Sequence, residues 1–365
     1  MKITHIHIER FRGFQNEDFE VGSLLTAIAG QNGTQKSTLL GIITQTFTLK
    51  TEDSMRVEKP LCGGSYISAF KDKFRLSPTF DKPKGHEWTI SFDAGMDDFT
   101  VESIKRTGDP NVRFWKKGAR QEGDGYISFP TIFLSLKRLV PVAEEAKIIT
   151  DDTLLTQEEL NEFKQLHNKI LIAQTPISSA TTITSKNKQS IGVSTELYDW
   201  NQNSMGQDNL GKIILALFSF KRLHDKYPRQ YKGGILAIDE MDATMYPASQ
   251  VELLKVLRKY ASKLNLQILF TTHSMSLLKA MDDLVQEVTK KEETANQAKI
   301  LYLKKVDDKI AIKQGVNFKG IQLDLNVVAE GNNRKKNRIT AYTEDKENIL
   351  FVKAILKSKE IGRAH

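Results

Sequence analysis

The sequence predicts an α/β fold with a β-rich N-terminal lobe, and three observations carry this prediction. A glycine-bearing loop, 30–38, follows the apolar run 24–29 and precedes another apolar run, which is the strand–loop–helix order of a phosphate-binding loop. The short, continuously apolar segment 234–238 and the segment 266–272 are typical of strands buried on both faces. Alternation of apolar and polar residues over 86–93 indicates antiparallel strands in the first half of the chain. We therefore expect an α/β core joined to a lobe made mostly of strands.

The remaining elements follow from hydrophobic periodicity, turn residues and capping signals. Apolar residues at helical spacing predict the helix 206–223, and Thr156 with Glu159 is the capping-box signal of a helix running to about residue 172. The Ser/Thr-rich segment 175–195 indicates a loop or a weak hairpin. The expected strands are 2–10, 24–29, 86–93, 98–106, 112–116, 125–129, 129–134, 234–238 and 266–272, with a hairpin over 299–313, and the expected helices are 36–48, 156–172, 206–223, 248–263 and 274–290.

The composition is that of a globular protein with a sizeable core: of 365 residues, 39% are apolar and 27% are charged. Cys62 is the single cysteine, which excludes a disulfide framework and a cysteine-based zinc site and agrees with a reducing compartment. No apolar run approaches the roughly 20 residues that span a bilayer, and the N-terminus has no signal-peptide pattern. We therefore expect a cytoplasmic protein with no membrane partner.

The net charge of +8 permits nucleic-acid binding, and DNA is the expected partner of this kind. Part of the positive excess also serves a phosphate ligand, and a run of charges is otherwise a solvated face. Basic clusters lie at Lys71, Lys73, Arg75, Lys82 and Lys84, at Lys116, Lys117 and Arg120, and at Arg334, Lys335, Lys336 and Arg338.

The loop after the strand 24–29 has the residue types that hold a nucleoside triphosphate. Backbone N–H groups of such a loop point at phosphate oxygens, and the helix N-terminus adds positive potential. The Lys36 ammonium would reach the β- and γ-phosphates, and the Ser37 hydroxyl would hold Mg²⁺. The predicted nucleotide contacts are Gly30, Asn32, Gly33, Gln35, Lys36, Ser37 and Thr38.

Gln35 departs from this pattern, which has glycine directly before the lysine. Glycine is typical there because the backbone has a positive φ or lies close to phosphate. A glutamine at the same backbone angles costs roughly 1 kcal/mol and brings a side chain near the γ-phosphate. The sequence therefore predicts nucleotide binding and leaves the rate of hydrolysis open.

Two acidic residues and a histidine follow the buried strands at their C-terminal ends. Asp239 can hold Mg²⁺ directly or through water, and Glu240, one residue later, can polarise an attacking water. His273, after the strand 266–272, can contact the γ-phosphate and orient that water. We therefore predict Glu240, His273 and Lys36 as catalytic residues, and Ser37 and Asp239 as metal ligands.

The sequence Ser204-Met-Gly206-Gln207 stands at the start of the helix 206–223. A helix N-terminus with a serine hydroxyl can donate hydrogen bonds to a phosphate. Such a cap is usually too far from the phosphate loop of its own chain. Ser204, Gly206 and Gln207 are therefore predicted to bind the nucleotide of a second subunit.

In this order and at this spacing, the motifs resemble the ABC-type ATPase heads shared by SMC proteins, RecF proteins and the OLD nucleases. The opening segment 3–14 (Ile-Thr-His-Ile-His-Ile-Glu-Arg-Phe-Arg-Gly-Phe) is similar to the start of those heads. The resemblance implies an ABC-type (RecF/SMC-like) P-loop ATPase head over 1–320, with ATP and Mg²⁺ as cofactors. It also implies a homodimer or higher oligomer in which two heads enclose two ATP molecules and Ser204 to Gln207 act as the signature motif in trans.

The length of chain between the N-terminal motifs and the motifs that begin at Ser204 distinguishes the branches of this class. SMC-type heads carry hundreds of coiled-coil residues there, whereas this chain has a short helical insertion at about 145–203. That length favours the OLD-like and RecF-like branch, which includes the ATPases of retron and Septu (PtuA-type) phage-defence systems. The segments 133–141 and 239–247 are similar to that branch, although Tyr246 stands where a histidine usually precedes the proline.

The C-terminal stretch 330–365 resembles the start of a TOPRIM nuclease domain. An apolar-biased strand precedes Glu344, whose counterpart in that family helps to hold a catalytic metal. The further acids of such a domain would come from later strands, so we expect an incomplete TOPRIM-like start belonging to a longer protein. An ordinary terminal strand and helix is the alternative.

The resemblance implies an ATP-driven dimerising switch of an antiphage defence system, which controls an attached or partner nuclease acting on DNA. A retron reverse transcriptase with its RNA is a further candidate partner. Two other interpretations stay open. One is a RecF-like DNA-repair ATPase, and the other is an ATP-binding scaffold with little hydrolysis, which Gln35 favours.

Overall fold

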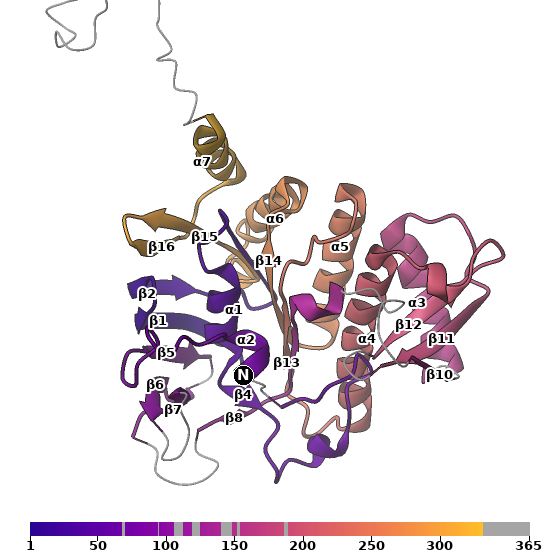
Figure 1. Ribbon diagram of the computed structural model, residues 1–365, viewed down its shortest axis with the longest axis horizontal. Coiled ribbons are helices and arrows are strands. Elements are labelled where there is room, and N and C mark those ends of the chain that lie inside the picture. The colour runs from indigo at the N-terminus through magenta and orange to yellow at the C-terminus, as the bar shows by residue number, and fades with distance from the viewer. Residues whose placement is uncertain are drawn as a thin grey trace, which may run out of the picture. The chain divides into compact units, whose positions relative to one another are not determined.

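The computed structural model describes residues 1–67, 70–93, 95–105, 112–118, 125–139, 148–151, 154–185 and 189–330 (Figure 1). The chain divides into two units, Met1–Gln322 and Leu323–His365, and the second is described only as far as the end of helix α7 (Phe318–Glu330). The predicted TOPRIM-like start with Glu344 therefore lies outside the described residues. The basic residues Arg120, Arg334, Lys335, Lys336 and Arg338 lie outside them as well.

The N-terminal lobe is built on a five-stranded antiparallel sheet with the strand order β2-β1-β5-β6-β7. In β1 the side chains of Ile6, Ile8 and Phe11 are buried, and those between them are partly or fully exposed, so the alternation seen in the sequence sets the two faces of the sheet. The strands are β1 (Ile3–Phe11), β2 (Phe14–Glu20), β5 (Glu87–Phe92), β6 (Phe99–Lys105) and β7 (Val112–Lys116).

A six-stranded sheet with the order β16-β15-β3-β14-β13-β9 forms the centre of the first unit. Its strands are β3 (Leu25–Gly30), β9 (Thr131–Leu134), β13 (Gly234–Ile238), β14 (Leu266–Thr272), β15 (Ala298–Val306) and β16 (Lys309–Lys313). All pairs are parallel except β15 with β16. Every residue of β13 and β14 is buried, which explains the continuous apolar sequence of β13 and the apolar run 268–270 in β14.

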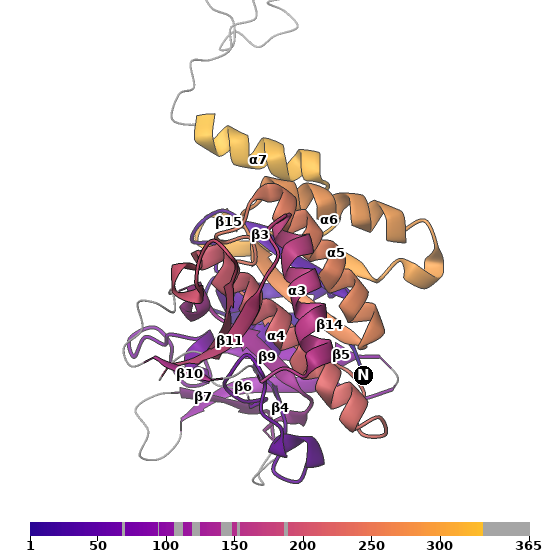
Figure 2. The same cartoon turned by 90° about the vertical axis from the view of Figure 1, so that its right-hand side faces the viewer.

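Helices pack on this sheet and on one another. The helices are α1 (Lys36–Thr44), α2 (Phe70–Lys73), α3 (Gln157–Leu171), α4 (Met205–Lys226), α5 (Pro247–Lys263) and α6 (Met275–Val288). Helix α1 packs on β3, β13 and β14, while α4 packs on α3 and on the strand β12 (Gln189–Ser194). Figure 2 shows α3, α5 and α6 as neighbours. None of the helices in the described part of the chain has the length and apolar character needed to cross a membrane.

Two expected elements differ from the structure. The helix 36–48 ends at Thr44, and the strand β4 (Phe47–Thr48) follows it because it pairs with β8 (Ile127–Ser128) far along the chain. The stretch 145–203 is not wholly helical. Beside α3 it contains a three-stranded antiparallel sheet made of β10 (Ile149–Asp151), β11 (Ser179–Thr184) and β12, so the hairpin within 175–195 is present.

One hydrophobic core joins the N-terminal lobe to α1. Buried Phe11, Trp88 and Phe114 of the lobe belong to the same cluster as Leu39 of α1. The ring centroids of Phe11 and Phe114 lie 5.4 Å apart, and those of Trp88 and Phe114 lie 5.1 Å apart. Each such buried ring contributes on the order of 2 kcal/mol. The turn that joins β1 to β2 is therefore held firmly beside the start of α1.

Cys62 is buried, with 2% of its surface exposed. Burial raises the pKa of its thiol to about 11, which keeps the sulfur protonated at neutral pH. The thiolate is the reactive form of cysteine, so this side chain packs as a small apolar group.

Candidate nucleotide site

The carboxyl ends of the parallel strands bring the predicted site residues to one edge of the six-stranded sheet. The phosphate loop follows β3, Asp239 and Glu240 follow β13, and His273 follows β14. Because β14 lies between β3 and β13, these three segments are neighbours in space. Together they form one cluster, which we call the candidate nucleotide site.

Lys36 is buried at the start of α1, with its ammonium folded back onto the loop. Its Nζ donates hydrogen bonds to the carbonyl oxygens of Gly30 (3.1 Å) and Gln31 (3.0 Å). Burial lowers the pKa of Lys36, although three nearby carboxylates, of which Glu240 acts most strongly, oppose the shift. Two neutral carbonyl groups are weaker partners for an ammonium than an anion is. The geometry therefore suits exchange of these carbonyls for phosphate oxygens.

The backbone of the loop needs its glycines. Gly30 has φ of 152°, and a Cβ at this position would lie 2.5 Å from the carbonyl oxygen of Leu303. Gly33 has φ of 80°, in the left-handed region. Asn32, Gly33 and Ser37 are exposed. The tip of the loop is thus open to a ligand, while its base is packed against β15.

Gln35 occupies the left-handed region, with φ of 61° and ψ of 33°. A glycine would adopt these angles freely, whereas a glutamine carries strain of about 1 kcal/mol. Its amide nitrogen lies 3.0 Å from where a Cβ on Gly13 would stand, so the side chain contacts the β1–β2 turn. Its Oε1 atom is buried without a hydrogen-bond partner in the described part of the chain. Gln35 thus joins the phosphate loop to the N-terminal lobe.

Asp239 and Ser37 meet directly, although they are 202 positions apart. The Ser37 hydroxyl donates to Asp239 Oδ1 over 2.8 Å, and the Thr271 hydroxyl donates to the same oxygen over 2.7 Å. One carboxylate and one hydroxyl, supplemented by water and phosphate oxygens, match the ligands that Mg²⁺ prefers. The described residues contain no cluster of three histidine, cysteine, aspartate or glutamate side chains, so no all-protein metal cage competes with this pair.

Glu240 follows Asp239 in a tight turn with φ of 50°. Its backbone N–H donates to Thr271 Oγ1 (2.6 Å), and its carbonyl oxygen accepts from Arg138 Nη2 (2.8 Å). The main chain is therefore fixed on both sides of this residue, at the position directly after Asp239.

His273 is exposed at the end of β14, and its backbone N–H donates to Asp242 Oδ1 (3.3 Å). Burial lowers the pKa of its imidazole, and the Lys36 ammonium lowers it further against the opposing pull of the nearby acids. The ring is therefore neutral at pH 7. A neutral imidazole can accept a proton or donate its single N–H to a phosphate oxygen.

The Ser204 cap, residues Ser204 to Gln207, forms a capping box at the start of α4. Ser204 Oγ accepts from Gln207 N (3.3 Å), and Gln207 Oε1 accepts from Ser204 N (2.8 Å). A Cβ on Gly206 would lie 2.5 Å from Thr244 O, so glycine allows the cap to approach the turn after β13. Ser204 is exposed, and within the described residues no hydrogen bond joins the cap to the phosphate loop.

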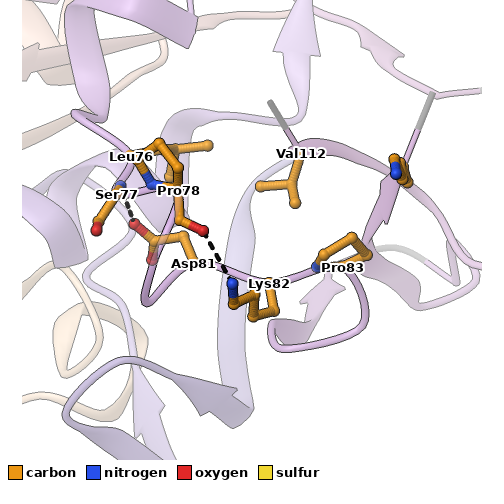
Figure 3. Close-up of a pocket in the computed structure, with 8 residues that line it drawn as sticks. Leu76, Ser77, Pro78, Asp81, Lys82, Pro83 and Val112 are labelled. Carbon is orange, nitrogen blue, oxygen red and sulfur yellow. Dashed lines mark hydrogen bonds between the residues drawn. The ribbon is translucent and has the colours of Figure 1, made fainter. Parts of the chain in front are cut away.

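Arg12 also belongs to the candidate nucleotide site. It stands in the two-residue β1–β2 turn with φ of 52°, and its Nη1 lies 3.5 Å from Thr38 Oγ1, beside the first turn of α1. Asp81 holds the guanidinium through Nε (3.1 Å) and Nη2 (3.0 Å). Figure 3 shows Asp81 lining a pocket of about 230 Å³, where it also accepts a hydrogen bond from the backbone of Ser77 (2.7 Å). A fixed cation thus faces the phosphate loop from the N-terminal lobe.

Sequence reasoning did not assign chemistry to Arg12, Thr271 or Arg138. Arg12 lies inside the segment 3–14 that carries the family resemblance, so a signal existed for it. Thr271 precedes His273 by two residues and could have been found as a polar side chain at the end of a buried strand. Arg138 lies inside the segment 133–141, which also carries the family resemblance, so a signal existed for it as well, although its partners Asn209 and Glu240 lie far along the chain.

Comparison with known proteins agrees with this geometry. The chain matches the family model of the AAA ATPase domain over residues 1–190 and 135–278. No curated protein gives a match. Among solved structures, the chain is similar to the SMC head domain from Thermotoga maritima, with 14% identity, a TM-score of 0.47, and coverage of 87% of this chain and 100% of that chain.

Two further structures resemble it to the same degree. An SMC head bound to the C-winged helix domain of ScpA has 14% identity, a TM-score of 0.50, and coverage of 88% of this chain and 100% of that one. An SMC head with an extended coiled coil, bound to the C-terminal domain of ScpA derived from Pyrococcus furiosus, has 13% identity, a TM-score of 0.48, and coverage of 90% and 99%. At such low identity the likeness concerns the fold, and the expectation of an SMC-like P-loop ATPase fold is confirmed.

Proposed function

The chain belongs to the AAA ATPase domain family, and from this premise we propose that it binds and hydrolyses ATP as a switch that pairs two copies of the chain. The observation that carries the proposal is the contact between Ser37 and Asp239 beside the buried Lys36. It joins a phosphate-binding loop to an acid at the end of a parallel strand, as phosphoryl-transfer sites require.

Each group has a task that its chemistry supports. The loop N–H groups, Lys36 and Arg12 bind the phosphates and orient the chain of ATP. Ser37 and Asp239 would hold Mg²⁺, which supplies positive charge opposite the β- and γ-phosphate oxygens. Glu240 accepts a proton from the water that attacks the γ-phosphorus, and ADP leaves as the bond to its β-phosphate oxygen breaks.

The Ser204 cap supports the pairing of two copies. Its hydroxyl oxygen already accepts from Gln207 N, and within the described residues its own proton has no acceptor. Ser204 is exposed and Gly206 is buried against the turn after β13, while the chain's own phosphate loop follows β3, two strands away. We therefore place the cap of one copy against the γ-phosphate held by the other.

A biological setting follows from the resemblance to the OLD-like and RecF-like branch and from the short insertion at about 145–203. We propose an antiphage defence role in the cytoplasm, in which paired heads control an attached or partner nuclease that acts on DNA. A retron reverse transcriptase with its RNA is a further candidate partner. A RecF-like repair ATPase is the alternative, and the strained Gln35 supports a scaffold with slow hydrolysis as a third.

Mixing two defective variants tests the composite site. Glu240→Gln removes the base of a copy's own site, and Ser204→Arg removes the cap that it offers to its neighbour. Each variant alone should lose turnover by about 100-fold or more. A mixed pair has one intact site, so an equimolar mixture with random pairing should recover about one quarter of the wild-type rate. Absence of recovery, with wild-type turnover present, would exclude completion of the site by a second copy.

A further inference from the structure

Arg138 is a buried cation close to the candidate nucleotide site. It is 2% exposed. Burial lowers its pKa to about 10, and the nearby Asp239 and Glu240 oppose that shift. Its hydrogen bonds within the described residues all go to uncharged acceptors: Nε donates to Asn209 Oδ1 (2.7 Å), Nη1 to the carbonyl oxygens of Leu134 (3.2 Å) and Ser135 (3.1 Å), and Nη2 to the carbonyl oxygen of Glu240 (2.8 Å).

A buried guanidinium of this kind is costly to a fold. Removing a charge from water carries a large penalty unless an opposite charge pairs with it directly, and packing alone would be served better by an apolar side chain. Residues that break the usual rules of core packing are found most often at functional sites, where they hold other groups in place. The hydrogen-bond partners of Arg138 indicate which part of the site it holds in place.

The first partner is the backbone of Glu240. This residue has φ of 50°, a conformation that costs a non-glycine residue about 1–2 kcal/mol. Its N–H is bound by Thr271 and its carbonyl oxygen by Arg138. Without the second bond, the turn would be held on one side only and the strained conformation would compete with relaxed ones.

The second partner, Asn209, ties Arg138 to α4. Its Oδ1 accepts from Arg138, and its Nδ2 donates to the carbonyl oxygen of Ala243 (2.9 Å). Asn209 is fully buried, one turn after the Ser204 cap. The turn 240–244 is thus attached to the start of α4 at two carbonyl groups, one through Arg138 and one through Asn209 itself.

We propose that Arg138 is a positioning residue for hydrolysis, which holds the Glu240 carboxylate in place by anchoring the Glu240 carbonyl to Asn209 and to the end of β9. The inference rests on the proposed function, since it assigns Arg138 to the same site. Arg138 touches no reacting atom and acts only through the backbone of Glu240.

Arg138→Lys is the sharpest variant. Lysine keeps the positive charge, but its three N–H donors share one nitrogen, so it cannot reproduce the planar guanidinium that reaches Asn209 from Nε and Glu240 from Nη2. We expect kcat to fall about 10- to 100-fold, because small misplacement of a catalytic group is costly, while the affinity for a non-hydrolysable ATP analogue stays at the wild-type value. The matched control is Arg222→Lys, since Arg222 lies on α4, the helix that carries Asn209, and pairs with Glu159 away from the site. It should leave kcat unchanged.

Mixed pairs separate a positioning role from a general structural one. In the mixture of Glu240→Gln with Ser204→Arg, the Ser204→Arg copy supplies the working Glu240 and the other copy supplies the cap. Arg138→Lys added to the Ser204→Arg copy should abolish the recovered turnover. The same change in the Glu240→Gln copy should leave the recovery in place. Equal loss from either copy would overturn the proposal in favour of a structural role.

Asn209→Ala guards against the case in which Arg138→Lys does not fold, because it removes the same anchor from the other side. It should lower kcat in the same direction without changing nucleotide affinity, and the two changes combined should cost less than the product of their separate effects. Wild-type kcat in both single variants would refute the positioning role of Arg138 but would leave the proposed function intact. Absence of turnover in the wild-type chain would refute the proposed function instead.

Discussion

The phosphate loop and the Ser204 cap are both helix starts that can receive a phosphate, and they differ in what completes them. The loop is joined by buried contacts to other strands: Ser37 reaches Asp239, and Lys36 lies among carboxylates. The cap bonds to itself and to Tyr198, Gly206 is buried against the turn after β13, and Ser204 is exposed. The first can bind a ligand within one chain, whereas we propose that the second meets a ligand held by another copy.

The largest expected effect is on the loop. Lys36→Ala removes the ammonium that would bind two phosphates, and charge-assisted bonds of this kind are worth about 3 kcal/mol, or about 100-fold in affinity. Calorimetric titration with a non-hydrolysable ATP analogue should show this loss in dilute protein. Lys279→Ala is the control, because Lys279 pairs with Asp283 on the surface of α6. Wild-type affinity in Lys36→Ala would contradict the claim that the phosphate loop binds the nucleotide within one chain.

The next effect is on the cap, and it should separate binding from turnover. Ser204→Arg places a bulky cation where a second copy would approach, so we expect turnover to fall by about 100-fold. Nucleotide affinity, measured at concentrations where the chain is single, should not change. Light scattering with the analogue should show wild-type copies pairing. Weakened binding in the variant would mean that the cap serves its own loop.

Acid should weaken the part of the fold that carries the cap. Burial lowers the pKa of His167 to about 4, on α3, which packs against α4. Below about pH 6.5 the unfolded imidazole takes up a proton that the folded one refuses, so stability is full above that pH and falls towards pH 4. At pH 5 this costs about 2 kcal/mol. His167→Phe should remove that loss in chemical denaturation, whereas His224→Gln, at an exposed site, should keep it. Identical pH profiles for His167→Phe and wild type would contradict the prediction.

The smallest effect concerns Gln35. Glycine at this left-handed position relieves about 1 kcal/mol of strain but adds a similar entropy cost in the unfolded chain. Gln35→Gly should therefore leave the free energy of unfolding nearly unchanged. Any change in turnover would then report the contact between Gln35 and the β1–β2 turn. A loss of several kcal/mol would show that this contact, rather than the backbone angle, dominates.

Much of the fold and part of the site could be predicted from the sequence because their signals are local. The strand before Gly30 and the buried runs of β13 and β14 depend on neighbouring residues only. The end of α1 could not be predicted, since Phe47 leaves the helix to pair with Ile127. For 175–195 the sequence left a loop and a weak hairpin open, because β12 owes its burial to packing on α4 rather than to an apolar sequence. The third strand of that sheet, β10, was not predicted.

The same difference between local and long-range signals explains which residues of the site could be predicted. Lys36 and Asp239 are marked by adjacent motif residues, so the sequence predicts their roles, which stay proposals until nucleotide binding is measured. Arg138 gains its place from Asn209 and Glu240, which are 71 and 102 positions away. Arg12 gains its place from Asp81, 69 positions away. The partners in such long-range hydrogen bonds cannot be identified from a single sequence, although both arginines lie in segments that carry the family resemblance.

The buried thiol of Cys62 offers a practical route to watching two heads meet. Because this sulfur is protonated and shielded at neutral pH, a maleimide dye would leave it unmodified. A cysteine introduced on the exposed surface would then be the only reactive thiol, with no need to alter the natural residue. Donor- and acceptor-labelled preparations, mixed with and without nucleotide, would report their encounter through fluorescence energy transfer.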